Sequence, residues 1–385
     1  MKILILGGDG YLGWPTSMHL ASKGHNVAIV DNMSKRVWEA ECSVEPLFPI
    51  STIATRISIF ERLTGFKIDT YVGDIAKNHR FIYKVFQEFS PDAIIHYAEQ
   101  PSAPYSMKSR ESCFETQRNN VLGNLNVMFA MAKYTPNAHL IKLGTMGEYG
   151  TPNIDIEEGW LDITHKGRKD RVLYPKKPHS FYHLSKVHDS HNLEFGCRVW
   201  GLKVTDLNQG VVYGTSTKET DLDPKLFTSF HYDHIFGTVL NRFLVQSVAN
   251  IPLTIYGDGT QTRPALNIND TIKCVEIALN NPAIKGEFRV FNQFTESFKI
   301  NDLANLVKEV GDEESLNVNI QNIDNPRTEQ MSHYYNAKNT NLKDLGLNPI
   351  YLSKNVLKEM LLKVIEYKNR IDIKTIMPDI KWAKK

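Results

Sequence analysis

Tyr182 and Lys186 have the residue types and the spacing of a catalytic pair. On a helix, an i, i+4 separation places the phenol and the ammonium on one face, where they can interact. A phenol has a reference pKa of about 10, and a nearby positive charge favours the phenolate that a base requires. The same spacing also occurs by chance on the surfaces of ordinary helices. The pair therefore indicates catalysis only if a ligand site accompanies it.

A hydroxyl group ends the apolar segment that precedes this pair. Residues 139–145 are typical of a buried strand, which ends in Thr145 and is followed by a glycine-containing turn at 146–150. A threonine there can hydrogen-bond the substrate oxygen that Tyr182 deprotonates. Thr145, Tyr182 and Lys186 together predict a site that removes a proton from an alcohol.

Glycines at positions 7, 8, 10 and 13 follow the first apolar run, residues 3–6, and open a predicted helix. Glycine lacks Cβ, so the backbone and the helix N-terminus can approach a pyrophosphate, where free N–H groups and the helix dipole favour negative charge. A tight strand-to-helix turn without a ligand is the alternative explanation. The spacing predicts a dinucleotide site.

Asp31 ends the second predicted strand, where its carboxylate can accept hydrogen bonds from the adenosine ribose and repel a 2′-phosphate. Arg36 follows closely and could bind such a phosphate, so both cofactors are considered and NAD is preferred to NADP. Asp74 follows a further short strand and could lie near the adenine amino group. These residues make NAD the expected cofactor.

Short apolar runs alternate with helical stretches over the first 215 residues. Strands without polar alternation, separated by helices, predict an α/β fold with a Rossmann-type doubly wound parallel sheet. We expect an NAD-binding domain at 1–215 and a smaller mixed α/β substrate-binding lobe at 216–385, with the chain free to cross between them, and a ligand cleft at the carboxyl ends of the strands. The predicted strands are 3–6, 26–30, 93–96, 139–143 and 203–207.

Composition excludes several classes of protein. The 385 residues are 42% hydrophobic and 23% charged, as in ordinary globular proteins, and the formal net charge of +2 argues against nucleic acid or an anionic membrane as the main partner. The four cysteines show no metal or disulfide pattern, so no metal site is predicted. No apolar run reaches the length of a membrane span, and the first strand begins at once, so a cytoplasmic enzyme is expected.

The order of the glycine-rich turn, Asp31, Thr145, Tyr182 and Lys186 resembles the extended short-chain dehydrogenase/reductase family of nucleotide-sugar epimerases, dehydratases and decarboxylases. Segments 119–126, 207–214 and 256–263 also resemble motifs of that family. The resemblance implies a homodimer and two sets of binding residues. The cofactor set is Gly7, Gly10, Tyr11, Leu12, Gly13, Asp31, Asn32, Arg36, Asp74, Ile75, Asn119, Tyr182, Lys186, Gln209 and Val212. The substrate set is Gln100, Thr145, Gln209, Thr238, Asn241, Arg242, Tyr256, Arg263 and Arg327.

The two residues directly after Thr145 narrow the range of reactions. Dehydratases of the family carry Thr-Asp-Glu at this place, whereas this chain has Met146 and Gly147, so an ordinary dehydratase is disfavoured. Segments 144–159, 181–192 and 209–214 resemble a narrower group, which implies UDP-glucose and sulfite, or a sulfite donor, as substrates, with NAD regenerated in each cycle. Elimination across C5 and C6 then needs an acid and a base, for which we nominate Glu148 and His183.

Other functions remain open from the sequence. A nucleotide-sugar 4-epimerase or an atypical 4,6-dehydratase would share every cofactor and catalytic residue. A non-catalytic NAD-binding sensor on the same fold is a third reading, although an intact set of Thr145, Tyr182 and Lys186 argues against it. Pro101 stands where the narrower resemblance implies an arginine, which removes one candidate contact for an anion.

Overall fold

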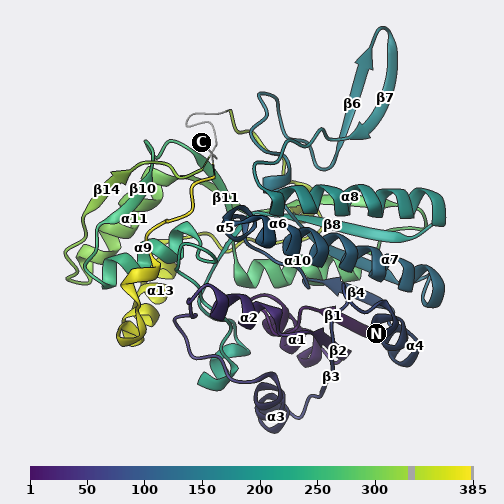
Figure 1. The fold of residues 1–385 in the computed structure, drawn as a ribbon, viewed down its shortest axis with the longest axis horizontal. Helices are drawn as coiled ribbons and strands as arrows, with labels where there is room; N and C mark the ends of the chain where they lie inside the picture. Colours follow the sequence, from purple (N-terminus) through teal and green to yellow (C-terminus); the bar gives the residue numbers. More distant parts are fainter. Residues whose placement is uncertain (328–333, 383–385) are drawn as a thin grey trace.

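The computed structural model describes residues 1–327 and 334–382. Its main sheet has seven parallel strands in the order β12-β8-β5-β4-β1-β2-β3 (Figure 1). β1 and β4 are buried at nearly every position because successive apolar side chains face both layers of helices. The predicted doubly wound parallel sheet is therefore confirmed. The strands are β1 (Lys2–Leu6), β2 (Asn26–Asp31), β3 (Ile68–Val72), β4 (Ala93–His96), β5 (His139–Thr145), β8 (Lys203–Gln209) and β12 (Phe288–Gln293).

Helices cover both faces of this sheet. On one face, Trp14, Phe60 and Val275 pack against Ile3, Ile5 and other strand residues; this layer is α1 (Gly13–Ser22), α3 (Ile53–Thr64), α10 (Ile268–Asn280) and α12 (Asn341–Asp344). The opposite face packs against α4 (His79–Phe89), α7 (Gly123–Tyr134) and α8 (Phe181–Trp200). Two separate apolar cores thus hold the sheet, one on each side, and fix the ends of its strands.

The smaller lobe lies beside this domain, on the left of Figure 1. Its core is formed mainly by α9 (Val239–Val248), α11 (Ile300–Glu313) and α13 (Lys354–Glu366). Two small sheets complete it. One contains β9 (Val211–Tyr213), β11 (Thr262–Asn267) and β13 (Glu296–Lys299), and the other β10 (Leu253–Tyr256) and β14 (Ile320–Ile323).

The chain crosses between the two lobes more than once. β12 pairs in parallel with β8, and α10 packs on the main sheet, although both follow residue 215. Residue 215 therefore divides the sequence, but the main sheet and its helices also include segments that follow this residue. A separate hairpin, β6 (Trp160–His165) and β7 (Arg168–Leu173), projects from the body at the top of Figure 1.

Candidate active site

A cavity of about 440 Å³ opens at the carboxyl ends of β1, β2, β4, β5 and β8 and reaches into the smaller lobe. Open α/β sheets bind their ligands at this edge. Most of the predicted site residues line the cavity. They are Gly7, Gly10, Tyr11, Leu12, Gly13, Asp31, Asn32, Ile75, Asn119, Thr145, Tyr182, His183, Gln209, Val212, Thr238, Asn241, Arg242, Tyr256, Arg263 and Arg327.

Of the described residues in the two predicted sets and the catalytic set, Arg36, Asp74, Gln100, Glu148 and Lys186 are not part of the cavity lining. The Asp74 carboxylate accepts hydrogen bonds from the N–H groups of Ala76 and Lys77 and so closes a turn. The Gln100 backbone N–H donates to Asn120, and its side-chain oxygen accepts from Ser102. Both residues therefore shape loops behind the lining.

The glycine-rich loop has the conformation that a phosphate-binding turn requires. Gly7 has a φ of +86°, and its N–H donates to the Val30 carbonyl at 2.7 Å. A Cβ on Gly13 would lie 1.9 Å from the Gly7 carbonyl oxygen, so the first turn of α1 can pack against the loop only if residue 13 is glycine. The hydroxyl of Tyr11 donates to the Gly214 carbonyl at 2.8 Å and joins the loop to the segment that leads into the smaller lobe.

Asp31 lies at the end of β2 and borders the cavity. Its carboxylate accepts the N–H of Asp9 at 2.8 Å and that of Met33 at 2.7 Å. Burial raises its pKa, an effect that these two hydrogen bonds oppose. The carboxylate is thus fixed where the ribose of a dinucleotide would lie.

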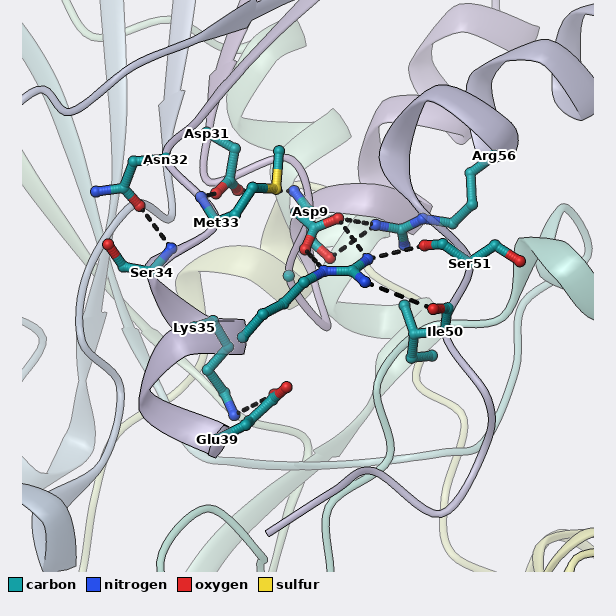
Figure 2. Close-up of polar contacts among 12 residues, drawn as sticks. Asp9, Asp31, Asn32, Met33, Ser34, Lys35, Glu39, Ile50, Ser51 and Arg56 are labelled. Atoms are coloured by element: carbon teal, nitrogen blue, oxygen red, sulfur yellow. Dashed lines mark hydrogen bonds and ion pairs between the residues drawn. The ribbon is translucent and has the colours of Figure 1, made fainter. Parts of the chain in front are cut away.

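Arg36 is held away from the cavity by Asp9. Its Nε donates to Asp9 Oδ2 at 2.7 Å, and a terminal nitrogen donates to Asp9 Oδ1 at 3.0 Å. The same nitrogen also donates to the Ser51 carbonyl at 2.8 Å. Arg56, which is fully buried, pairs with Asp9 from the other side (Figure 2). The guanidinium of Arg36 is therefore engaged, and the residues present fit NAD rather than a 2′-phosphorylated dinucleotide.

Two of the three candidate catalytic residues, Thr145 and Tyr182, line the same cavity, and the third, Lys186, lies beside Tyr182. Thr145 ends β5, and Tyr182 and Lys186 lie in the first turns of α8, with the Lys186 Nζ 5.9 Å from the centre of the Tyr182 ring. Lys186 Nζ also lies 2.6 Å from Glu99 Oε2 and donates to the Leu143 carbonyl at 2.5 Å. Burial, and then the charge of Glu99, raise the pKa of the Tyr182 phenol above its ordinary value.

Glu148 belongs to a buried charge cluster behind the cavity. Its carboxylate pairs with Lys176, lies 3.6 Å from Lys142 Nζ and accepts hydrogen bonds from Ser190 and from the N–H of Thr145. Burial raises its pKa, but the two lysines outweigh burial and bring it to about 2. Glu148 is thus a permanent carboxylate that fixes Thr145, and its position gives no support to the nominated role as acid or base.

His183 lines the cavity and occupies the space beside Gly147. A Cβ at residue 147 would lie 2.4 Å from His183 Nε2, so the imidazole stands where a side chain at this position would otherwise be. The Ser180 hydroxyl lies 3.0 Å from His183 Nδ1 and orients the ring. Burial, and then the charge of Arg327, lower the pKa of His183 to about 3, so the ring is neutral at pH 7.

Positive charge collects in the part of the cavity formed by the smaller lobe. The guanidinium of Arg242 donates to the Tyr256 hydroxyl at 3.0 Å and to the Thr254 carbonyl at 3.1 Å. The guanidinium groups of Arg242 and Arg327 lie 4.3 and 5.9 Å from the centre of the Tyr256 ring. Burial lowers the pKa of Arg242; Tyr256 opposes this effect, and the charge of Arg327 adds to it. Neighbouring cations of this kind favour a bound anion, and a guanidinium suits a diphosphate.

Several lining residues were not identified from the sequence, including Lys35, Trp38, Glu99 and His231. Lys35 Nζ lies 3.0 Å from His231 Nε2, although the two residues are far apart along the chain, so no local pattern could have indicated the contact. Glu99 does have a signal, because it follows the carboxyl end of a buried parallel strand, where ligands bind. That rule could have added it to the predicted site.

Within residues 1–327 and 334–382, no helix combines the length and the apolar character that a membrane-spanning segment needs.

Comparison with known proteins agrees with this geometry. The model of the NAD dependent epimerase/dehydratase family matches residues 3–292. The chain is 52% identical over 383 residues to the chloroplastic UDP-sulfoquinovose synthase of Spinacia oleracea, covering all of this chain and 79% of that protein. It is 41% identical over 387 residues to the UDP-sulfoquinovose synthase of Sulfolobus acidocaldarius, covering all of this chain and 98% of that one.

Solved structures show the same fold. The UDP-glucose 4-epimerase of Thermus thermophilus, determined in complex with NAD, superimposes with a TM-score of 0.67 at 20% identity, covering 94% of this chain and 99% of the epimerase. The match of the family model to most of the chain, and the identity to both relatives along its whole length, lead to one assignment. The chain belongs to the NAD dependent epimerase/dehydratase family.

Proposed function

We propose that this protein is a UDP-sulfoquinovose synthase, which converts UDP-glucose and sulfite to UDP-sulfoquinovose and water. The observation that carries this proposal is the identity of 52% and 41%, along the whole chain, to two proteins of that name. The cavity supports it, because one lining surface combines a dinucleotide loop, Thr145 with Tyr182, and a group of arginines, and Lys186 lies beside Tyr182. NAD is the cofactor.

Tyr182 begins and ends the reaction in this proposal. It takes the proton from the O4 hydroxyl of glucose, while Thr145 hydrogen-bonds the same oxygen. NAD, which the glycine-rich loop and Asp31 would hold, would supply a reversible hydride acceptor for C4, so no net oxidant would be consumed. Lys186, held by the Leu143 carbonyl and Glu99, keeps a positive charge next to the phenol. When the hydride returns, Tyr182 gives its proton back to O4.

His183 is the base that we propose for C5. A ketone at C4 acidifies the C5 proton, which passes to the imidazole. The imidazolium then gives that proton to the C6 hydroxyl, which leaves as water and forms a 5,6-alkene. Bisulfite adds through sulfur at C6, and the proton that it carried passes through His183 to C5. The position of His183 beside Gly147 supports this role, because the family's dehydratases carry a carboxylate at the equivalent place. A diphosphate on Arg327 would offset the charge that depresses the pKa of His183 and so strengthen the base.

The UDP-sugar is held by its diphosphate in this proposal. Arg242, Arg263 and Arg327 line the lobe side of the cavity and provide the positive charge. Pro101 also lines the cavity and carries no charge, so sulfite would depend on these arginines or on Lys35 for attraction. Either free sulfite or a donor that carries it is compatible with such a surface.

The proposal is tested by mass spectrometry of the purified enzyme incubated with UDP-glucose, with and without sulfite. We expect a sulfonated UDP-hexose only when sulfite is present. Tyr182→Phe should abolish it, since the variant lacks the hydroxyl that accepts the O4 proton. Formation of UDP-galactose or of a 4-keto-6-deoxy sugar, unchanged by sulfite, would instead indicate an epimerase or a dehydratase.

We also propose that the protein is a homodimer that pairs through α7 and α8. Phe129 on α7 and Phe195 and Trp200 on α8 are exposed, and their rings pack together, with centres 5.0 Å apart for Phe129 and Trp200. Exposed aromatic side chains that gather on neighbouring helices are typical of an interface.

Cytoplasmic location stays a prediction from the sequence. One relative is named as chloroplastic, and fractionation of native cells with an antibody to this chain would decide between the two compartments.

A further inference from the structure

Glu99 is a buried carboxylate in the catalytic centre to which the mechanism above assigns no chemical step. It lies just beyond the carboxyl end of β4, is 8% exposed and lines the cavity. Its Oε2 lies 2.6 Å from the Nζ of Lys186. Neither of its carboxylate oxygens has a hydrogen-bond partner among the residues that the structure describes, so Lys186 compensates Glu99 as an ion pair. A buried carboxylate is costly unless a cation compensates it, and here the cation is the catalytic lysine.

The other buried lysines nearby have carboxylate partners of their own. Lys142 on β5 lies 3.6 Å from Glu148 and 3.5 Å from Asp206 on β8, and Lys176 pairs with Glu148. Asp189 on α8 is buried and its pKa is raised well above the ordinary value, first by burial and then by Glu99. His96 on β4 is buried, and burial lowers its pKa to about 4. Lys186 is thus the ammonium that Glu99 balances.

We propose that Glu99 is a positioning residue that holds the Lys186 ammonium and offsets its charge next to Tyr182. The inference rests on the proposed use of Tyr182 as the base at O4. An unopposed ammonium would favour the phenolate strongly. With Glu99 beside it, Tyr182 holds its proton firmly once it has taken it from O4. That proton then remains in place while C5 and C6 react and is available when O4 is reprotonated.

The test begins with the pH dependence of hydride transfer. Wild type and Glu99→Gln, both loaded with NAD, are mixed with UDP-glucose without sulfite, and the absorbance of NADH is followed. Removing one negative charge should move the acidic limb of the rate profile to lower pH by about one unit. Glu99→Asp keeps the charge and should stay near the wild-type profile. A profile that is identical in wild type and Glu99→Gln would overturn the proposal.

A second readout requires no sugar substrate. Tyrosine labelled with ¹³C at Cζ is titrated in the NAD-loaded protein, with Tyr182→Phe identifying the resonance. The phenol of Tyr182 should titrate at lower pH in Glu99→Gln than in wild type, and equal titration would contradict the proposal. If Glu99→Gln does not fold, the same titration is made on the NAD-free wild type. A Tyr182 that titrates well below pH 10 there would show that Glu99 does not offset the charge of Lys186 and would overturn the proposal. Failure of the synthase assignment would change the product and leave these titrations unaffected.

Discussion

The neutral imidazole of His183 is the group that we expect to control the second stage of the reaction. Its place beside Gly147 brings it to the part of the cavity that follows Thr145. His183→Gln should retain NADH formation from UDP-glucose and lose exchange of the C5 proton with deuterated solvent by about a hundredfold or more, since a general base contributes this much. Mass spectrometry of the recovered UDP-sugar measures the exchange.

The variant Glu148→Gln is compared with His183→Gln, because both residues were nominated for the elimination across C5 and C6. Because Glu148 fixes Thr145 and pairs with buried lysines, its loss should lower stability and both stages of the reaction together. Normal C5 exchange in His183→Gln would eliminate the histidine as the base. If Glu148→Gln instead loses C5 exchange and keeps NADH formation, Glu148 is the base at C5.

Cofactor choice is a second property set by single residues. Asp31 borders the cavity, whereas Arg36 is tied to Asp9 and Ser51. Arg36→Gln should therefore change the ratio of NADH to NADPH affinity by less than about twofold. Asp31→Ser should lower the ratio of NADH to NADPH affinity by about tenfold or more, since it removes a charge that repels the 2′-phosphate. Fluorescence titration gives both affinities, and a tenfold change in Arg36→Gln would show that this arginine reaches the ligand.

Residue spacing predicted part of the site and left the rest undetermined. Thr145, Tyr182 and Lys186 were identifiable because one lies at a strand end and two share a helix face, which are local properties. The sequence could not distinguish Glu148 from His183, since Glu148 lies close to Thr145 and His183 lies next to Tyr182 along the chain. Only the packing shows that one carboxylate faces the buried lysines and that the imidazole faces the cavity.

At the scale of elements, α7 and α8 are expected to carry the contact between two copies of the chain. Phe129→Glu places a charge among Phe195 and Trp200 and should convert the dimer to a monomer, because burying an unpaired carboxylate is unfavourable. Light scattering measures the mass. Tyr351→Glu is the matched control, because Tyr351 is 54% exposed and precedes α13 in the smaller lobe. A monomeric wild type would contradict the proposed interface.

The elements also show where sequence patterns stop being informative. The apolar runs that become β1, β2 and β4 were predicted because a strand buried on both faces has few polar residues. β5 and β8 contain more polar residues and were predicted from their place in the alternation of strands and helices. β12 was not, since it is an edge strand that contains Arg289 and Asn292 and joins the sheet long after β8. The hairpin β6–β7 was missed as well, because β7 is mostly charged and exposed and the apolar alternation in β6 is limited to Leu161 and Ile163.

At the scale of the whole molecule, buried histidines couple folding to pH. Both ring nitrogens of His96 lack a hydrogen-bond partner among the described residues, and burial lowers the pKa of His96 to about 4. Above about pH 6.5, the reference pKa of histidine, neither the native nor the unfolded chain is protonated at this residue. Below that pH, the unfolded chain gains a proton that the native protein does not. The contribution of His96 to stability is therefore lost as the pH falls from about 6.5 to 4.

His96→Leu removes this titrating group, so its free energy of unfolding should rise relative to wild type as the pH falls. The expected gain is about 1.4 kcal/mol per pH unit, or about 3 kcal/mol between pH 6.5 and 4. Urea unfolding followed by circular dichroism at several pH values measures the difference between the two proteins. Comparing variants is essential because Asp270, whose pKa burial raises to about 6, changes the stability of both proteins in the opposite direction. The control is His165→Leu, because His165 is exposed and its difference in free energy of unfolding from wild type should not change with pH. If the difference for His96→Leu is equally independent of pH, His96 is protonated in the native state.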